Sequence, residues 1–167
     1  MLILSRLESG KPATPPDVVS IRDAIEAAIR TVEPAAQVRN VNLIRGGIED
    51  LRTMGSRTGI EQALVNLLDN AVKFNRSGGE VRAEACRTPD GQVRIIVADT
   101  GIGIPSGDLS RIFERFYRVD RSRSREMGGT GLGLSIVKHT IERMNGKVTV
   151  ESQLGKGSTF TVLFPAN

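Results

Sequence analysis

Residues 61–75 read EQALVNLLDNAVKFN, and this stretch decides the fold of the 167-residue chain. Its apolar residues recur at intervals of three and four, the pattern of a helix that packs one side against a core. These residues are Leu64, Leu67, Leu68, Ala71 and Val72. Asn66, Asn70 and Lys73 recur with the same period, and at 3.6 residues per turn they lie on the opposite face. The stretch therefore predicts a helix with an apolar side and a separate polar side.

The polar side of this helix allows two interpretations. Two amides and an ammonium group aligned on one face can bind an oxygen-rich anion or a hydrated metal ion. The alternative is an ordinary solvated face, because asparagine also occurs on helices that have no binding role. The helix alone does not decide between them, so the rest of the chain is needed.

The composition indicates one globular domain with an aliphatic core. Apolar residues make up 39% of the chain and charged residues 25%, with five Phe, one Tyr and no Trp. The net charge of +4 is a mild excess that permits weak, non-specific nucleic-acid binding but indicates no specific nucleic-acid partner. Cys86 is the only cysteine, which excludes an internal disulfide, and we expect it to be a small core residue. No apolar run reaches the roughly 18 residues of a membrane span and no secretory signal opens the chain, which predicts a cytoplasmic segment without membrane contact.

The region before the polar helix is expected to contain a linker and a first helix. Residues 1–10 read as the last turns of a helix that begins further upstream, and residues 11–16 carry three prolines and form a linker. Asp17 is expected to cap the N-terminus of a helix that ends before Pro34. Short strands are predicted at 41–45 and 51–54, with a turn at Gly46–Gly47 between them.

The region after the polar helix is expected to contain two hairpins separated by a long loop and a helix. The predicted elements are a hairpin over 81–98, a loop-rich segment over 99–130 with one short amphipathic piece at 109–116, a helix over 131–144, and strands around 148–150 and 160–164. Adjacent antiparallel strands backed by helices on one face predict a two-layer α+β sandwich.

Residues 99–105 read DTGIGIP and directly follow the most apolar predicted strand. An ionised Asp99 carboxylate there needs a donor, because burying an unpaired charge is costly. The exocyclic amine of a purine is a suitable donor. Gly101 and Gly103 allow the backbone to approach a flat ring closely and to adopt positive φ. The alternative is a tight turn capped by the aspartate.

Residues 128–134 read GGTGLGL and open the second long helix. Glycines before a helix N-terminus expose backbone N–H groups to an anion, and the helix dipole adds positive potential, so phosphate binding is expected. The stretch matches neither standard phosphate-binding template. The motif GxxxxGK[ST] does not occur in the chain, and Leu134 occupies the last glycine position of GxGxxG.

Residues 112–127 lie between the two glycine-rich stretches. Phe113 and Phe116, three residues apart, are expected to anchor one end of the segment by burial. Beyond them, four arginines occur within the eight positions 118–125, a composition that resists packing. The segment is either a disordered surface loop or a lid that becomes ordered when a polyphosphate binds.

The four stretches NLLDNAVKF, DTGIGIP, IFERFYRVD and GGTGLGLSIVK together resemble the N, G1, F and G2 boxes of the catalytic, ATP-binding domain of sensor histidine kinases. This domain belongs with gyrase, Hsp90 and MutL in the Bergerat (GHKL) fold, and the resemblance covers residues 17–165. It implies an α+β two-layer sandwich whose mixed, mostly antiparallel sheet carries its helices on one face. It also implies that residues 1–16 end a dimerisation helix and its linker, and that residues 17–167 form the ATP-binding catalytic domain.

The resemblance implies roles in binding ATP and Mg²⁺ for individual residues. Asn70 corresponds to the Mg²⁺ ligand, with Asn66 beside it, and Lys73 corresponds to a residue that reaches phosphate. Asp99 would accept a hydrogen bond from the adenine amine. The other implied nucleotide contacts are Phe74, Gly101, Gly103 and Thr159 near the adenine, and Gly129, Thr130, Gly131, Leu132 and Gly133 on the phosphates. Arg118 would contact the γ-phosphate, so that Asn66, Lys73 and Arg118 form the implied catalytic set.

The residues favour phosphoryl transfer over ATP hydrolysis. Relatives that hydrolyse ATP place a glutamate general base where this chain has Asn66, and an amide cannot accept a proton at neutral pH. Glu61, the nearest upstream carboxylate, projects near the leucine stripe by helical phase. A serine kinase of the anti-sigma-factor type and a GHKL ATPase remain as alternatives.

The phosphoacceptor is expected outside this chain. His139 is the only histidine and lacks the acidic neighbour and downstream proline that mark a kinase phosphoacceptor, so we expect a partly exposed helical residue and no autophosphorylation by this chain alone. The resemblance implies two partners: the phosphoacceptor helical hairpin of the parent kinase and, through the parent, a response regulator. It further implies a monomeric fragment and a homodimeric parent that can be membrane-anchored.

Overall fold

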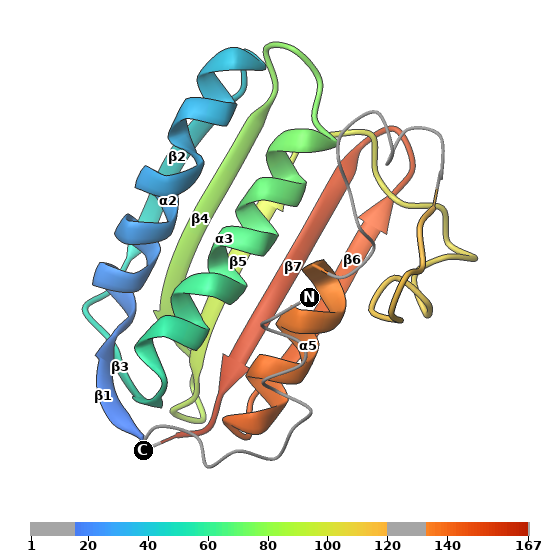
Figure 1. The fold of residues 1–167 in the computed structure, drawn as a ribbon. Helices are drawn as coiled ribbons and strands as arrows, with labels where there is room; N and C mark the ends of the chain where they lie inside the picture. The colour runs from blue at the N-terminus through green and yellow to red at the C-terminus, as the bar shows by residue number, and fades with distance from the viewer. Residues whose placement is uncertain (1–15, 120–132, 167) are drawn as a thin grey trace.

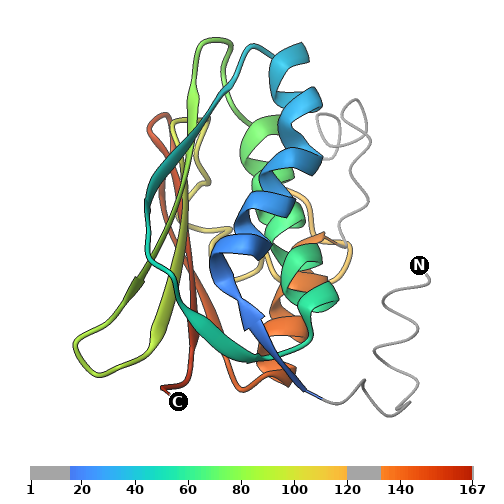
Figure 2. The same cartoon turned by 90° about the vertical axis from the view of Figure 1, so that its left-hand side faces the viewer.

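A computed structural model of the chain describes residues 16–119 and 133–166 and shows two layers, a sheet and a set of helices that cover one of its faces (Figures 1 and 2). The elements in chain order are β1 (Asp17–Ser20), α2 (Ile21–Val38), β2 (Asn42–Ile48), β3 (Arg52–Gly55), α3 (Arg57–Lys73), β4 (Glu80–Arg87), β5 (Val93–Asp99), α5 (Gly133–Arg143), β6 (Lys147–Gln153) and β7 (Gly157–Phe164). None of the helices within the described residues is both long and apolar enough to cross a membrane.

The main sheet has five strands in the order β2-β4-β5-β7-β6, with β2 parallel to β4 and the other neighbours antiparallel. A separate two-stranded sheet pairs β1 with β3. The structure therefore confirms the α+β sandwich with a mixed, mostly antiparallel sheet and helices on one face. Both expected hairpins, β4–β5 and β6–β7, are present.

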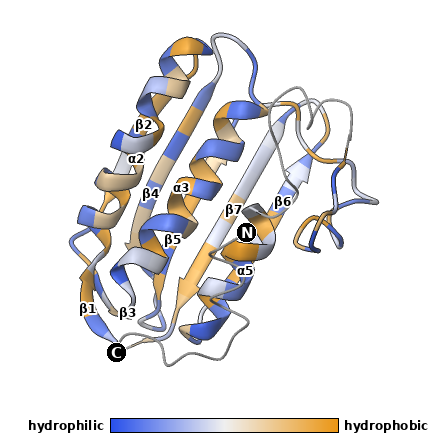
Figure 3. Ribbon diagram, in the orientation of Figure 1, coloured by the Kyte–Doolittle hydropathy of each residue, from blue (hydrophilic) through white to orange (hydrophobic). Residues whose placement is uncertain are grey.

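The core lies between the helices and the face of the main sheet that they cover, which we call the inner face. Alternate residues of each strand point into it, as the two-residue period of a strand requires, and those of β7 are Phe160, Val162 and Phe164. The leucine stripe of α3 is at most 4% exposed, which confirms the apolar side predicted from the sequence. Each such side chain contributes about 1.5–3 kcal/mol by leaving water. Figure 3 shows that each helix carries both apolar and polar residues.

The start of the chain differs from the sequence expectation in two ways. Asp17 does not cap a helix. It begins β1, because Val19 is buried when Val18 and Val19 pair with β3 in an extended conformation. Helix α2 starts after Ser20 instead and continues through Pro34 to Val38. Pro34 has no N–H to donate to the carbonyl of Arg30, four residues earlier in the helix. Both residues are exposed, so water can bind that carbonyl instead.

The expected turn at Gly46–Gly47 is also absent. Both glycines lie inside β2, where the pairing with β4 shifts register between Arg45 and Ile48. A Cβ atom on Gly46 would lie 2.4 Å from Cγ of Glu84, so the bulge requires a residue without a side chain. The strands β2 and β3 consequently belong to different sheets and do not form a hairpin.

Cys86 is not a core residue. It alternates with the buried Ala85 on β4 and therefore lies on the face of the sheet opposite the helices, where it is half-buried. Nη2 of Arg94, on the neighbouring strand, donates a hydrogen bond of 3.3 Å to its Sγ atom. The alternation expected in this strand correctly buries Ala83 and Ala85, and the same alternation turns Cys86 to the outer face.

The segment after β5 differs from the expectation in its local structure. A run of turns occupies residues 106–116, where an amphipathic piece was expected. Ile112 is buried, and Phe113 packs edge-on against Phe160 with ring centroids 6.2 Å apart. Phe116 does not anchor the segment, since it is 62% exposed and has φ of 63°. Only one of the two expected phenylalanine anchors is therefore present.

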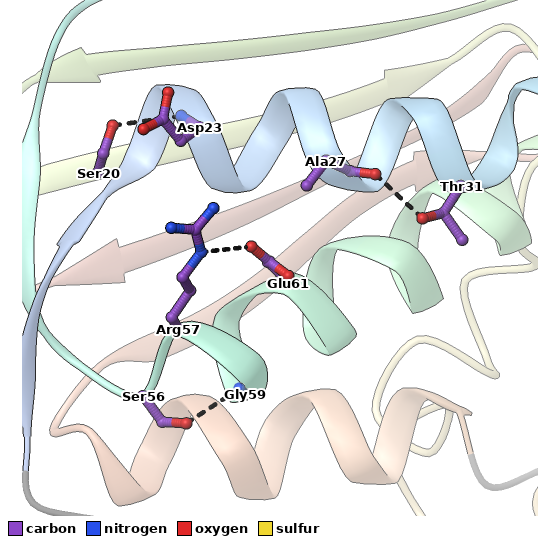
Figure 4. Close-up of polar contacts among 8 residues, drawn as sticks. All are labelled: Ser20, Asp23, Ala27, Thr31, Ser56, Arg57, Gly59 and Glu61. Carbon is purple, nitrogen blue, oxygen red and sulfur yellow. Dashed lines mark hydrogen bonds and ion pairs between the residues drawn. The ribbon is translucent and has the colours of Figure 1, made fainter.

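Side-chain caps fix where the first two helices begin (Figure 4). Oγ of Ser20 accepts a hydrogen bond from the backbone N–H of Asp23, and Oγ of Ser56 accepts one of 3.1 Å from that of Gly59. The cap at Ser56 starts α3 at Arg57, earlier than the sequence pattern indicated. The Arg57–Glu61 ion pair in the first turn is largely exposed and adds little stability.

We expect Ser56→Ala to lower the free energy of unfolding by about 1 kcal/mol, because the N–H of Gly59 loses its partner. The matched control is Thr31→Ala, which removes a hydroxyl that only back-bonds to the carbonyl of Ala27 on the exposed side of α2 and should change stability by less than about 0.5 kcal/mol. Urea denaturation of both variants measures the difference. Equal losses in the two variants would contradict the cap.

Candidate functional site

The polar side of α3 lies beside the start of α5. Asn66, Asn70 and Lys73 are all half-buried. The side-chain amide of Asn66 donates to the carbonyl of Gly133, the first residue of α5, over 3.4 Å, and its oxygen accepts from Nε2 of Gln62. This contact joins two segments that are far apart in the sequence and that both belong to the candidate site.

The other two residues on the polar side of α3 differ in their partners. Nζ of Lys73 forms an ion pair of 2.9 Å with Asp69, one turn earlier on the helix. The side chain of Asn70 forms no hydrogen bond with any residue in the ranges 16–119 and 133–166. A half-buried amide without a protein partner retains one acceptor oxygen and two N–H donors for a ligand.

Asp99 ends β5 with a half-buried carboxylate. Its Oδ1 accepts hydrogen bonds from the backbone N–H of Gly101, over 2.8 Å, and of Ser158, over 3.3 Å. Burial raises the pKa of the Asp99 carboxyl above its ordinary value, and the two N–H donors oppose that change without cancelling it. Backbone N–H groups thus supply donors to Oδ1, while no residue in the described part of the chain donates to Oδ2.

The glycines that follow Asp99 are required by close backbone packing. A Cβ atom on Gly101 would lie 2.5 Å from the carbonyl oxygen of Phe74 and 2.9 Å from Oδ1 of Asp99. Gly103 has φ of 74°, and a Cβ atom on it would lie 2.1 Å from the carbonyl oxygen of Gln153. Neighbouring backbone therefore leaves no room for a side chain at either glycine, and Gly103 adopts the positive φ that the sequence suggested.

Phe74 caps the C-terminus of α3 and connects it to the loop after Asp99. Its carbonyl accepts a hydrogen bond of 3.0 Å from the N–H of Ile102. The end of the asparagine-bearing helix and the loop of residues 99–104, which we call the Asp99 loop, are therefore held together through the backbone.

Thr159 lies on the opposite face of the sheet from Asp99. In β7 the buried positions are Ser158, Phe160, Val162 and Phe164, and Thr159 alternates with them. Ser158 is the cross-strand partner of Asp99, is 7% exposed, and shares a hydrogen bond of 2.8 Å with Oγ of Ser152. The structure therefore brings Ser158, and not Thr159, beside the aspartate.

The remaining candidate residues lie at or beyond the edges of the described chain. Arg118 is half-buried and forms no ion pair with another residue of the described ranges. Gly133 begins α5. Gly129, Thr130, Gly131 and Leu132 lie outside the described residues.

The chain is similar to known proteins in both sequence and fold. A family model described as histidine kinase-, DNA gyrase B- and HSP90-like ATPase matches residues 55–167. The chain belongs to this family. Within the family, it is 37% identical over 165 residues to the sensor-like histidine kinase SenX3 of Mycolicibacterium smegmatis, which covers 99% of this chain and 43% of SenX3. The chain therefore spans less than half the length of this curated relative.

Solved histidine kinase structures share the fold. Full-length ShkA in complex with AMPPNP has a TM-score of 0.83 and 31% identity over 98% of this chain and 34% of that one. The catalytic domain of ThkA has a TM-score of 0.77 and 27% identity over 91% of this chain and 96% of that one. ThkA is also known in complex with the response regulator TrrA, and that structure has a TM-score of 0.77 and 25% identity over 99% of this chain and 47% of that one. The chain thus corresponds to the catalytic, ATP-binding domain of sensor histidine kinases.

The residues present fit the nucleotide and the metal ion that this kinase family implies. Mg²⁺ favours oxygen ligands and keeps several waters, binding through one or two protein ligands and the phosphates of its nucleotide. The amide of Asn70, which has no hydrogen-bond partner in the described part of the chain, suits that mode. Within the described residues, no three His, Cys, Asp or Glu side chains gather to form a metal site of another kind.

Two residues of the site were missed by sequence reasoning. The inward orientation of Ser158 could have been predicted from the sequence. It is separated by even numbers of residues from the apolar Phe160, Val162 and Phe164, so all four side chains lie on the same face of the strand. Arg76, which follows α3, donates from Nη2 to the carbonyl oxygens of Gly101 and Gly155. No local sequence signal marks an arginine that bridges two loops.

We expect Asp99→Asn to melt at the same temperature as wild type or higher at about pH 7. The amide oxygen can still accept from Gly101 and Ser158, while the cost of a half-buried charge is removed. Because the folded-state pKa is raised, wild type loses stability relative to the variant as the pH rises from the ordinary value of 3.8 through the folded-state pKa. The difference should therefore vanish at about pH 4.

Thermal denaturation across this pH range measures the effect, with the exposed Asp50→Asn as a control that should follow wild type throughout. A melting temperature of Asp99→Asn that falls increasingly below wild type as the pH rises would contradict the cause assigned to the raised pKa.

Proposed function

We propose that residues 17–167 form a catalytic domain that binds Mg·ATP and donates the γ-phosphate to a histidine on a separate helical hairpin of the same kinase, to which residues 1–16 connect it. The observation that carries the proposal is the Asp99 carboxylate, which is half-buried and has one oxygen held by backbone donors and the other without a donor among the described residues. Such a carboxylate costs stability, which a binding role explains and a simple turn does not.

Asp99 recognises the base in this proposal. Its Oδ2 accepts from the exocyclic amine of adenine, and Oδ1 stays bonded to Gly101 and Ser158. The Asp99 loop, with Gly101 and Gly103, forms one wall of the base site, and Phe74 stands at its edge. Ser158 replaces Thr159 as the hydroxyl beside the aspartate, because only Ser158 shares its face of the sheet.

The polar side of α3 and the start of α5 hold the phosphates and the metal. Asn70 supplies an amide oxygen to Mg²⁺, with Asn66 next to it, and Lys73 exchanges Asp69 for a phosphate oxygen. The backbone of Gly129, Thr130, Gly131, Leu132 and Gly133 contacts the phosphates, and Arg118 contacts the γ-phosphate. The bound metal neutralises negative charge on the phosphates, and the protein contributes positioning.

The charged groups around α3 favour phosphoryl transfer over hydrolysis. Asn66 occupies the general-base position and is bonded to Gln62 and Gly133. Glu61 forms an ion pair of 2.8 Å with Arg57, and Asp69 is paired with Lys73. Both carboxylates are therefore paired with a cation before nucleotide binds, and Glu61, the nearest carboxylate upstream of Asn66, keeps its partner when Lys73 turns to phosphate, so it does not serve as a general base.

The acceptor and the partners lie outside this chain. His139 is half-buried on α5 and its Nε2 atom is buried without a hydrogen-bond partner among the described residues, so it is a poor phosphoacceptor. The kinase relative ThkA is known in complex with a response regulator, and we propose a response regulator as the final acceptor here too. We propose a cytoplasmic, monomeric domain within a homodimeric parent that uses ATP and Mg²⁺ and has no nucleic-acid partner.

We expect Asn70→Ala to remove most of the gain in ATP affinity that Mg²⁺ provides, a loss of about tenfold or more. Calorimetric titration of ATP with Mg²⁺ and with a chelator measures the gain. Gln37→Ala removes an exposed amide from α2 and is the matched control. A full Mg²⁺ effect in Asn70→Ala would refute the metal role, and absence of any ATP binding by wild type would refute the function.

We expect the chain incubated alone with γ-labelled ATP to acquire no stable label, because its only histidine has a buried Nε2. Autoradiography after gel separation measures the label, and His139→Ala gives the background. Label on wild type that is absent from His139→Ala would identify His139 as an acceptor and refute the separate-hairpin assignment.

A further inference from the structure

Arg76 connects two loops, one of which carries the Asp99 carboxylate of the candidate base site. Its Nη2 donates to the carbonyl of Gly101 in the Asp99 loop, over 3.4 Å, and to the carbonyl of Gly155 in the turn of residues 154–156 between β6 and β7. Hydrogen bonds from a charged donor are about twice as strong as neutral ones. The guanidinium therefore holds together two backbone segments that are far apart in the sequence.

The position of Arg76 is itself fixed by its neighbour Asn75. Oδ1 of Asn75 accepts a hydrogen bond of 2.8 Å from the N–H of Arg76, and Nδ2 of Asn75 donates to the carbonyl of Glu80 at the start of β4. The carbonyl of Arg76 accepts from the N–H of Gly79 over 2.9 Å. These bonds form a rigid turn after α3, so the arginine side chain starts from a defined backbone position.

Other contacts join the Asp99 loop to the β6–β7 turn and to the strand ends beside it. The N–H of Gly155 donates to the carbonyl of Ile102 over 2.7 Å, and the N–H of Ile104 donates to Oγ of Ser152 over 2.8 Å. Among these contacts, Arg76 is the one that binds the carbonyls of Gly101 and Gly155 together. Gly101, whose carbonyl Arg76 binds, donates its own N–H to Oδ1 of Asp99. The peptide groups on either side of Gly101 thus connect Arg76 to Asp99 through one residue.

Arg76 acts on the Asp99 loop through carbonyl groups and not through the charge of the carboxylate. Burial raises the pKa of Asp99 and the two backbone donors oppose that rise, and the guanidinium of Arg76 is not among the groups that shift it. A change at Arg76 should therefore alter the placement of the loop without altering the titration of Asp99.

We propose that Arg76 is a positioning residue for the base site, which clamps the Asp99 loop to the β6–β7 turn and so sets the placement of the Asp99 carboxylate toward a purine. The proposal rests on the proposed function for its effect on nucleotide affinity. The clamp itself is a property of the protein without nucleotide and can be tested separately.

The test compares Arg76→Met, Arg76→Lys and the control Arg82→Met with wild type. Methionine keeps much of the aliphatic stem and removes the donors, and lysine restores a charged donor. Arg82 is an exposed residue of β4 on the face opposite the helices, paired with Glu84 at 3.6 Å. The affinities of AMP, ADP and Mg·ATP are measured by calorimetry, and backbone amide exchange is followed in the protein without nucleotide.

We expect Arg76→Met to weaken all three nucleotides by a similar factor, on the order of tenfold, because the base site is common to them. The pH dependence of affinity should keep its midpoint, Arg76→Lys should recover part of the loss, and Arg82→Met should match wild type. The amides of Ile102 and Gly155 should exchange faster in Arg76→Met even without nucleotide.

Several results would overturn the proposal. A loss that grows from AMP to Mg·ATP would make Arg76 a phosphate contact, and an equal loss in Arg82→Met would make the effect one of net charge. A lysine variant as weak as the methionine variant would refute the charge-assisted clamp. Unchanged amide exchange in Arg76→Met would refute the clamp, whether or not the protein binds nucleotide. Failure of wild type to bind any nucleotide would refute the proposed function and leave the clamp to be judged by amide exchange.

Discussion

The structure depends on the rotation of α3 about its own axis, which the burial of its leucine stripe fixes. Leu64, Leu67 and Leu68 are nearly inaccessible to water, and turning the helix by one residue would expose them at a cost of about 1.5–3 kcal/mol each. The same rotation directs Asn66 to the first residue of α5 and leaves the amide of Asn70 without a hydrogen-bond partner among residues 16–119 and 133–166. Packing therefore determines where the polar side points, and the chemistry of the site follows from the packing.

A second constraint acts where α3 ends. The carbonyl of Phe74 binds the N–H of Ile102, and Gly101 approaches that carbonyl too closely to carry a side chain. The carboxylate of Asp99 is held in place by the same backbone groups, although its burial disfavours the ionised form. The loop thus maintains a charge in an environment that does not stabilise it fully, a common feature of binding sites, where stability is lost so that a ligand can be recognised.

The sequence predicted the elements whose periodicity is strong and local. The stripe of α3, both hairpins and the helix at Gly133 follow from spacing alone. It failed where a partner distant in the sequence decides the conformation. Asp17 and Val19 are extended because β3 pairs with them, and Gly46 lies inside a strand because β4 pairs with β2 on both sides of it. Pro34 would end an isolated helix, but its exposed position in α2 allows the helix to continue.

For the site, the sequence identified the residue types but not all of the neighbours. The structure places Asp99, Gly101 and Phe74, which the motifs singled out, next to one another. Thr159 and Ser158 are adjacent in the sequence, and only the orientation of β7, set by Phe160 and Val162, shows which one faces the aspartate. Arg76 could not be predicted, because its role depends on the meeting of two loops, at Gly101 and Gly155, that are far apart in the sequence.

The parallel pairing of β2 with β4 has a consequence for self-association. β2 forms one edge of the main sheet, and α2 packs beside α3 over the same part of the core. A polypeptide that began at α3 would lack β2 and α2. The N–H and C=O groups of β4 that pair with β2 would then be unpaired, and the apolar residues that α2 covers would be exposed to water. Unpaired strands of this kind template intermolecular β-pairing, so the segment that precedes α3 protects β4 and makes β2, with its register shift between Arg45 and Ile48, the edge of the sheet instead.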